Sequence, residues 1–96
     1  MSQNNDFEAH PIFEKKAEKL PKDVRKKLAK ALRMMALDTR HNSLQTHKVE
    51  GIRGFFGGDV FEAYVDMKYR FTWEYKNPRL LYLRNVDNHD ECLRNP

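Results

Sequence analysis

The 96 residues of this chain are 40% hydrophobic and 33% charged, and a formal net charge of +4 with a pI near 9.3 favours acidic partners. This length provides one domain with a single modest core and excludes a second domain. No apolar run approaches about 18 residues, which excludes a transmembrane helix. A single cysteine, Cys92, excludes an internal disulfide and predicts a reducing, cytoplasmic compartment.

The chain begins with a polar segment, residues 1–6, which we expect to be disordered. This segment lacks the basic and apolar regions of a signal peptide. Residues 7–96 are expected to form one domain. At its start, Phe7–Pro11 is compatible with a short edge strand, whose length Pro11 limits because proline has no N–H to donate.

Two amphipathic helices are predicted next. Ile12–Leu20 has apolar residues at helical spacing, and Pro21 then interrupts the pattern. Proline suits the first position of a helix, so a second helix is expected from Pro21 to about Leu37. The short break between the two predicts an antiparallel helical hairpin. The apolar stripe of the second helix consists of Val24, Leu28, Ala31, Leu32 and Met35.

The hairpin carries much of the positive charge. Between Glu14 and Arg33 there are nine Lys or Arg residues against three acidic ones. Three interpretations remain open from the sequence: a solvated helix face, a surface for the RNA backbone, or a docking face for an acidic protein.

The remainder of the chain has the turn and strand patterns of a sheet. Leu44–Val49 is compatible with a strand, and a glycine-punctuated connection, Gly51–Gly58, follows it. Three consecutive strands are predicted at Val60–Val65, Tyr69–Tyr75 and Leu80–Val86. We therefore expect an α+β domain, in which the helical hairpin packs on one face of a twisted antiparallel sheet of about four strands.

The middle one of these three strands alternates strictly between two kinds of side chain. One side carries aromatic residues and is expected to face the core, whereas Arg70 lies on the other side. We therefore expect Arg70 in a concave, largely solvent-facing groove, with His47 and His89 at its rim. The aromatic residues are Tyr69, Phe71, Trp73 and Tyr75.

The sequence gives little indication of a metal site or a nucleotide-binding loop. His89 and Cys92 have the spacing of two zinc ligands, but no second ligand pair accompanies them. Gly54–Gly58 is rich in glycine but lacks the lysine and Ser/Thr of a phosphate-binding loop. We therefore predict no cofactor.

The polar grouping that remains is suited to cleaving RNA without a metal. Such a reaction needs a base for the 2′-hydroxyl proton, an acid for the leaving 5′-oxygen and a cation against the phosphate. Histidine as a residue type titrates near neutral pH, so His47 and His89 can fill the two proton-transfer roles, and the fork of Arg70 matches phosphate oxygens. Additional contacts to RNA are expected from Lys48, Arg53 and Arg84.

The order and spacing of several short segments resemble the RelE/ParE superfamily of toxins from type II toxin–antitoxin systems. These segments are His10–Lys16 with Lys19-Leu20-Pro21, His47–Gly51, Phe61–Asp66, Tyr69-Arg70-Phe71 and His89-Asp90-Glu91. The resemblance covers roughly His10 to Asn95. It implies a microbial-ribonuclease-like fold with two helices against a twisted antiparallel sheet.

The resemblance also implies a function. RelE-like members cleave mRNA on the ribosome without a metal ion and are held inactive by a cognate antitoxin, which is expected here to be a small acidic protein encoded beside the toxin. By position, Arg70 is similar to the phosphate-binding arginine of the family and His89 to its general acid. His47 falls near the catalytic base of some members, with Lys48 and Arg53 as backbone contacts.

The chain also departs from the best-known RelE proteins. Those proteins carry a cluster of basic residues and a C-terminal tyrosine, where this chain has His47 and His89. ParE-like members share the fold but inhibit DNA gyrase instead. The paired histidines favour a ribonuclease, and a gyrase inhibitor or a repurposed binding domain remain the alternatives.

Overall fold

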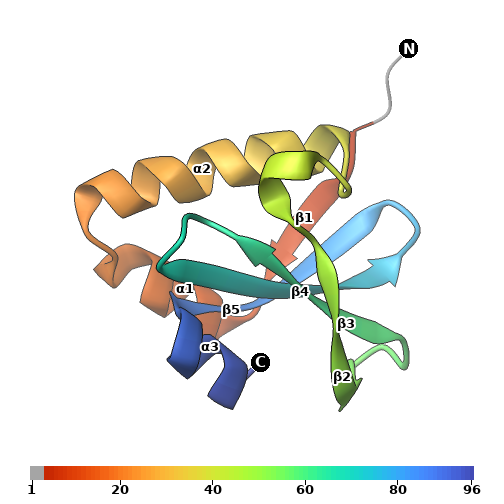
Figure 1. The fold of residues 1–96 in the computed structure, drawn as a ribbon. Helices are drawn as coiled ribbons and strands as arrows, with labels where there is room; N and C mark the ends of the chain where they lie inside the picture. Colours follow the sequence, from red (N-terminus) through yellow and green to blue (C-terminus); the bar gives the residue numbers. More distant parts are fainter. Residues whose placement is uncertain (1–3) are drawn as a thin grey trace.

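The computed structural model describes residues 4–96, which form five strands, three α-helices and one short 3₁₀ helix (Figure 1). In chain order these are β1 (Asp6–Ala9), α1 (Pro11–Lys19), α2 (Lys22–Leu37), η1 (Asn42–Leu44), β2 (His47–Arg53), β3 (Asp59–Tyr64), β4 (Tyr69–Asn77), β5 (Leu80–Asn88) and α3 (His89–Arg94). In this part of the chain, no helix has the length and apolar character needed to cross a bilayer.

The sheet is mixed and has five strands in the order β1-β5-β4-β3-β2. Strands β2 to β5 form the predicted antiparallel part, and β1 adds a fifth, edge strand that runs parallel to β5. The prediction of about four antiparallel strands was therefore one strand short. Parallel strands need a long crossover connection, and here the helices and the rest of the sheet lie between β1 and β5 in the chain.

The ordered domain begins slightly earlier than the sequence predicted. Residues 1–3, half of the segment expected to be disordered, lie outside the described residues. Asn5 donates its backbone N–H to the Ala36 oxygen at 2.8 Å, and Asp6 is the first residue of β1. The end of α2 therefore fixes the N-terminal strand.

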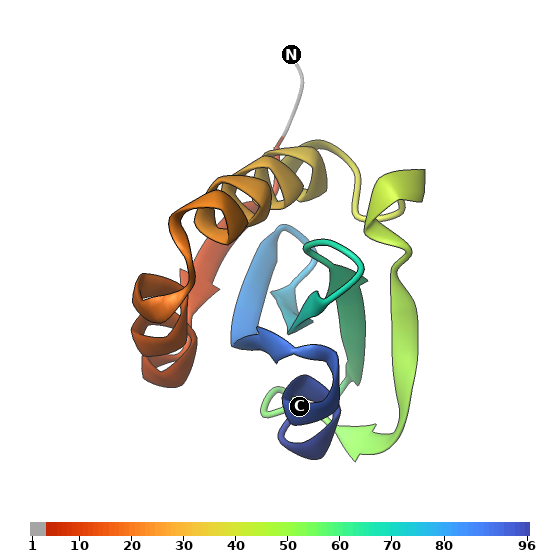
Figure 2. The same cartoon turned by 60° about the vertical axis from the view of Figure 1, so that its left-hand side comes forward.

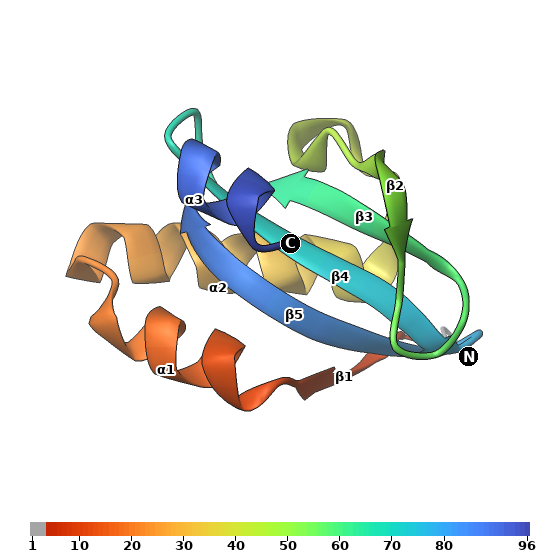
Figure 3. The same ribbon diagram turned by 90° about the horizontal axis from the view of Figure 1, so that it is seen from below.

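The helical hairpin is confirmed, and local chemistry explains where its helices start. The ring Nδ1 of His10 accepts the N–H of Ile12 at 3.0 Å and caps α1. Pro21 lies just before α2, one residue outside the predicted start. The chain reverses direction between the two helices, as Figure 3 shows from below.

The core lies between the helical hairpin and one face of the sheet (Figure 2). Phe71 and Trp73 of β4 are fully buried there, as the alternation predicted. From the helices, the buried residues Phe13, Leu28 and Met35 belong to the same cluster. Tyr75, the last aromatic residue of the predicted stripe, is exposed, and its hydroxyl lies 3.2 Å from Oγ1 of Thr39.

The opposite face of the sheet is also covered, which the sequence analysis missed. Helix α3 packs over β4 and β5, and its Cys92 is completely buried. The helix is capped by Asn88, whose side-chain oxygen accepts the N–H of Glu91 at 3.0 Å. An Asn followed three residues later by Glu is a helix-start pattern, so the sequence did contain a signal for this helix.

The turn between β2 and β3 covers the other end of this face. The buried Glu74 carboxylate accepts the backbone N–H groups of Phe55 and Phe56, each at 3.1 Å, and pairs with Arg84. A side chain on Gly54 would collide with that carboxylate, so the close approach requires glycine. The turn, the carboxylate and Arg84 form one rigid unit.

Candidate functional site

Strand pairing brings His47 and Arg70 to the same face of the sheet. His47 pairs with Glu62 across β2 and β3, and Tyr64, two residues further along β3, pairs with Arg70 on β4. Directly opposed residues share a face, as do residues two apart, so these four side chains point the same way. With strands ~4.8 Å apart and a rise of ~3.3 Å per residue, the Cα atoms of His47 and Arg70 are roughly 12 Å apart.

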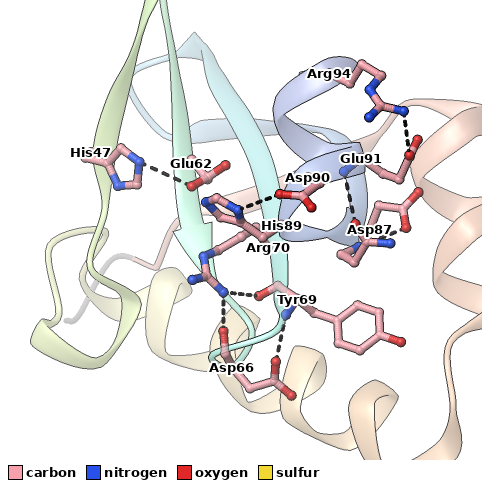
Figure 4. A network of polar contacts seen from close by, with 11 residues as sticks. His47, Glu62, Asp66, Tyr69, Arg70, Asp87, His89, Asp90, Glu91 and Arg94 are labelled. Atoms are coloured by element: carbon pink, nitrogen blue, oxygen red, sulfur yellow. Dashed lines mark hydrogen bonds and ion pairs between the residues drawn. The ribbon is translucent and has the colours of Figure 1, made fainter.

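His89 reaches this group from the start of α3. Tyr69 pairs with Asn88, and the backbone N–H of His89 donates to the Lys68 oxygen at 2.9 Å, so His89 lies beside the beginning of β4. Figure 4 shows His47, Glu62, Arg70 and His89 together on this side of the sheet. The structure thus brings together the three residues that the sequence analysis selected as catalytic.

Arg70 is buried, contrary to the expectation of a solvent-facing groove. Only 5% of the residue is exposed. Its Nη1 donates to the backbone oxygens of Asp66 at 2.5 Å and Tyr69 at 3.2 Å, and its Cζ lies 3.5 Å from the centroid of the Tyr64 ring. The expectation failed because α3 and the turn before β4 cover a face that strand alternation alone leaves open. The guanidinium is therefore held rigidly, and its Nε has no hydrogen-bond partner among residues 4–96.

Glu62 was not among the site residues predicted from the sequence. Its side chain is 1% exposed, and its Oε1 lies 3.2 Å from Nε2 of His47, whose own side chain is 51% exposed. Within the described residues, the other carboxylate oxygen of Glu62 has no partner. Alternation along β3 separates Glu62 from Phe61 and Ala63, but only the pairing of β2 with β3 reveals that it contacts His47.

The residues predicted to contact RNA do not join this group. Lys48 lies opposite Phe61, on the other face of the sheet, where its Nζ is 3.7 Å from Asp59. Arg53, also in β2, donates to the backbone oxygen of Gly57 at 2.9 Å. Both are on an edge strand away from Arg70.

Arg84 is occupied by other contacts. It pairs with the buried Glu74, and its Nε donates to the Pro96 oxygen at 2.9 Å. Thr72 pairs with Asn85 and the next residue, Trp73, pairs with Leu83, so Arg84 is the extra residue of a β-bulge. Arg84 lies on the same face of the sheet as Tyr82, which is opposite Glu74, and the pairing of β4 with β5 brings its guanidinium to that carboxylate.

A cleft of about 430 Å³ lies on the helical side of Tyr64. Its charged walls are Lys27 and Lys30 of α2, with His41 beside η1. Across residues 4–96, no three His, Cys, Asp or Glu side chains are grouped so as to hold a metal ion.

Two groups beside the site have shifted pKa values. Burial of Asp66 raises its carboxyl pKa, but the N–H groups of Tyr69 and Lys68, together with Lys27, outweigh this effect and lower the pKa below its usual 3.8. Burial, reinforced by the nearby carboxylates of Glu62 and Asp87, raises the pKa of the Cys92 thiol to about 12. Cys92 therefore remains a neutral thiol under α3 and is unsuited to act as a nucleophile.

No family model and no curated protein matches the chain, but solved structures share its fold. A chain of the archaeal RelE–RelB complex from Pyrococcus horikoshii superposes with a TM-score of 0.70 at 13% identity, covering 92% of this chain and 96% of that one. A YafQ mutant from E. coli gives 0.60 at 19% identity, covering 91% and 96%. A copper-bound mutant toxin from Helicobacter pylori gives 0.57 at 16% identity, covering 91% and 97%.

These matches identify the class of fold. The protein is a small α+β domain with the fold of RelE-like toxins, as the sequence resemblance predicted. Within that fold, the chain presents a buried arginine flanked by two partly exposed histidines.

Proposed function

We propose that this protein is the toxin of a type II toxin–antitoxin pair and a metal-independent endoribonuclease that cleaves mRNA on the ribosome and arrests translation in the cytoplasm. The observation that carries the proposal is the gathering of His47, Arg70 and His89 on one face of the sheet. Two histidines supply groups that give and take protons, and the arginine supplies a fixed positive charge for the phosphate. The fold shared with the RelE and YafQ structures supports the same proposed function.

The proposed partner is a cognate antitoxin, encoded next to the toxin. The RelE–RelB structure supports this part of the proposal, because it is a complex of RelE with RelB. On this chain, the basic outer face of α2 and the edge strand β2 offer positive charge and unpaired backbone groups. Co-expression of the neighbouring gene is expected to abolish any growth arrest.

The proposal is tested by primer extension on translated mRNA after induction of the chain in a bacterial host. Wild type is expected to produce discrete cleavages, whereas His89→Ala and Arg70→Ala are expected to slow cleavage about 10²–10⁴-fold. His41→Ala is the matched control, since it removes an exposed histidine outside this group. Equal cleavage by wild type and both site variants would refute the proposed site. Absent cleavage together with inhibited gyrase supercoiling would favour the ParE-like alternative.

A further inference from the structure

His47 lies between two hydrogen-bond acceptors. Its Nδ1 is 3.0 Å from the backbone oxygen of Gln45, and its Nε2 is 3.2 Å from Oε1 of Glu62. A backbone carbonyl oxygen only accepts, so Nδ1 must carry a hydrogen. Nε2 and Oε1 attract each other only when a hydrogen, from the ring or the carboxyl group, lies between them, because two facing lone pairs repel. The geometry therefore favours a pair that holds one proton more than a neutral imidazole and a carboxylate would.

The burial of Glu62 gives a physical reason for that extra proton. An isolated buried carboxylate is costly, and it either finds an opposite charge or becomes protonated. Among the described residues, His47 is the only basic side chain paired with Glu62. The pair is thus either imidazolium with carboxylate or imidazole with carboxylic acid, and both forms are neutral overall and able to give up a proton.

The charged groups on surrounding elements have other partners and do not replace this pairing. These contacts are Lys48 with Asp59, Arg70 with the backbone oxygens of Asp66 and Tyr69, Lys16 with Asp87, and His89 with Asp90. Within residues 4–96, the direct polar contacts of the His47 ring are therefore those with Glu62 and the Gln45 oxygen.

His89 has a different arrangement of partners. Its Nδ1 lies 3.3 Å from Oδ1 of Asp90, and a carboxylate at that position holds the hydrogen on Nδ1. Nε2 then carries the lone pair, and no hydrogen-bond partner for it is found in residues 4–96. The free lone pair makes His89 ready to accept a proton, whereas His47 already holds one.

We propose that His47 is the proton donor of the cleavage reaction, that His89 is the proton acceptor, and that Glu62 is the positioning residue that shares a proton with His47 and keeps its ring correctly oriented. This assignment rests on the endoribonuclease function proposed above, and it reverses the roles that the family resemblance implies for the two histidines.

The reaction balances with these groups alone. Nε2 of His89 takes the proton of the 2′-hydroxyl, the 2′-oxygen forms a bond to phosphorus, and the bond from phosphorus to the 5′-oxygen breaks. The 5′-oxygen receives the proton from Nδ1 of His47, replacing the Gln45 oxygen as the acceptor of that N–H. The Nε2–H of His47 remains hydrogen-bonded to Glu62 throughout. Glu62 thereby stabilises the imidazolium before the transfer and fixes the tautomer of the neutral ring afterwards. The products are a 2′,3′-cyclic phosphate and a 5′-hydroxyl.

The first test is NMR spectroscopy of the full chain at pH 7, which does not depend on activity. Ring ¹⁵N shifts of His47 and the carboxyl ¹³C shift of Glu62 are expected to show one shared proton in wild type. Glu62→Gln is expected to leave a neutral ring with its hydrogen on Nδ1. The control Glu50→Gln, an exposed carboxylate on the same strand, should match wild type. A neutral His47 ring beside an ionised Glu62 in wild type would overturn the inference.

The second test assigns the two roles by replacing the scissile 5′-oxygen of an RNA with sulfur. A thiolate leaves without being protonated, so the sulfur substrate makes the proton donor unnecessary. On normal RNA, His47→Ala and His89→Ala should each lose about 10²–10⁴-fold. On the sulfur substrate, presented free and in a programmed ribosome, His47→Ala should return close to wild type while His89→Ala stays slow. Glu62→Gln should follow His47→Ala, and Glu62→Asp should recover part of the loss on normal RNA.

The possible outcomes separate this inference from the proposed function. Rescue of His89→Ala in place of His47→Ala would overturn the role assignment and leave the endoribonuclease intact. A Glu62→Gln protein that cleaves both substrates like wild type would remove Glu62 from the mechanism. If wild type cleaves neither substrate, the nuclease function and the two roles fail together, and the NMR result still decides whether the pair holds the proton.

Discussion

The guanidinium of Arg70 lies over the ring of Tyr64, with its Cζ 3.5 Å from the ring centroid. Stacking on one side and donation to two backbone oxygens on another restrict the group to one orientation. A cation that is already ordered loses less side-chain conformational entropy when it binds a phosphate than a flexible cation does. Tyr64 serves here as the platform for the arginine.

Arg70→Lys is therefore expected to damage both stability and cleavage. Lysine keeps the positive charge but loses the contact of the guanidinium with the Tyr64 ring and one or both bonds to backbone oxygens, costing about 1–3 kcal/mol. RNA cleavage should fall between wild type and Arg70→Ala. Urea denaturation and primer extension measure the two effects, and Arg79→Lys in the turn between β4 and β5 is the control. A lysine variant indistinguishable from wild type in both assays would show that the fork geometry is unimportant.

Arg84→Ala is expected to act on stability and to leave RNA affinity unchanged. Removing Arg84 leaves the buried Glu74 carboxylate without its positively charged partner, and breaking such a pair costs about 3–5 kcal/mol of folding free energy. The Phe55-Phe56 turn, held by the same carboxylate, should become mobile, which backbone amide exchange would detect. Anisotropy with a short RNA, at a temperature where the variant remains folded, should give wild-type affinity. A large loss of affinity without a loss of stability would restore Arg84 as the RNA contact that the sequence predicted.

Asp66→Ala is expected to loosen the turn that leads into β4. The carboxylate accepts the backbone N–H groups of Lys68 and Tyr69, each at 2.8 Å, so its loss should cost about 1–3 kcal/mol at pH 7. Because folding lowers the pKa of Asp66, this stabilisation is fully present above the usual carboxyl value of 3.8 and is lost as the pH falls through the lower folded value. The difference between wild type and variant in urea denaturation should therefore shrink below about pH 4. Glu18→Ala, an exposed acid on α1, should show no such convergence.

Trp73→Ala is expected to cost about 3–5 kcal/mol, because the ring is fully buried in the core and stacks on Phe61 at a centroid distance of 4.9 Å. Met67→Ala, at an exposed position in the turn before β4, should change the free energy of unfolding by less than about 0.5 kcal/mol. Chemical denaturation of both variants measures these values. A loss below about 1 kcal/mol for Trp73→Ala would mean that the core is assigned to the wrong face of the sheet.

Local patterns in the sequence determined most of the secondary structure and the orientation of the core. Apolar spacing in Val24, Leu28 and Met35 specified the buried side of α2, because a helix repeats every 3.6 residues whatever its surroundings. The same reasoning applied to Phe71 and Trp73, whose alternation in β4 chose the core face before any partner strand was known. The selection of His47, Arg70 and His89 as one group followed from these patterns together with the family resemblance.

The tertiary structure decided what each of those residues touches. Glu62 meets His47 because β3 pairs with β2 in one register, and a shift of one residue would have turned the carboxylate to the other face. Arg84 meets Glu74 because β5 pairs with β4 in one register, with a bulge at Arg84. Arg70 is buried because α3 folds back over the sheet. Register, bulges and the docking of a terminal helix depend on contacts between segments far apart in the chain, and local periodicity carries no information about them.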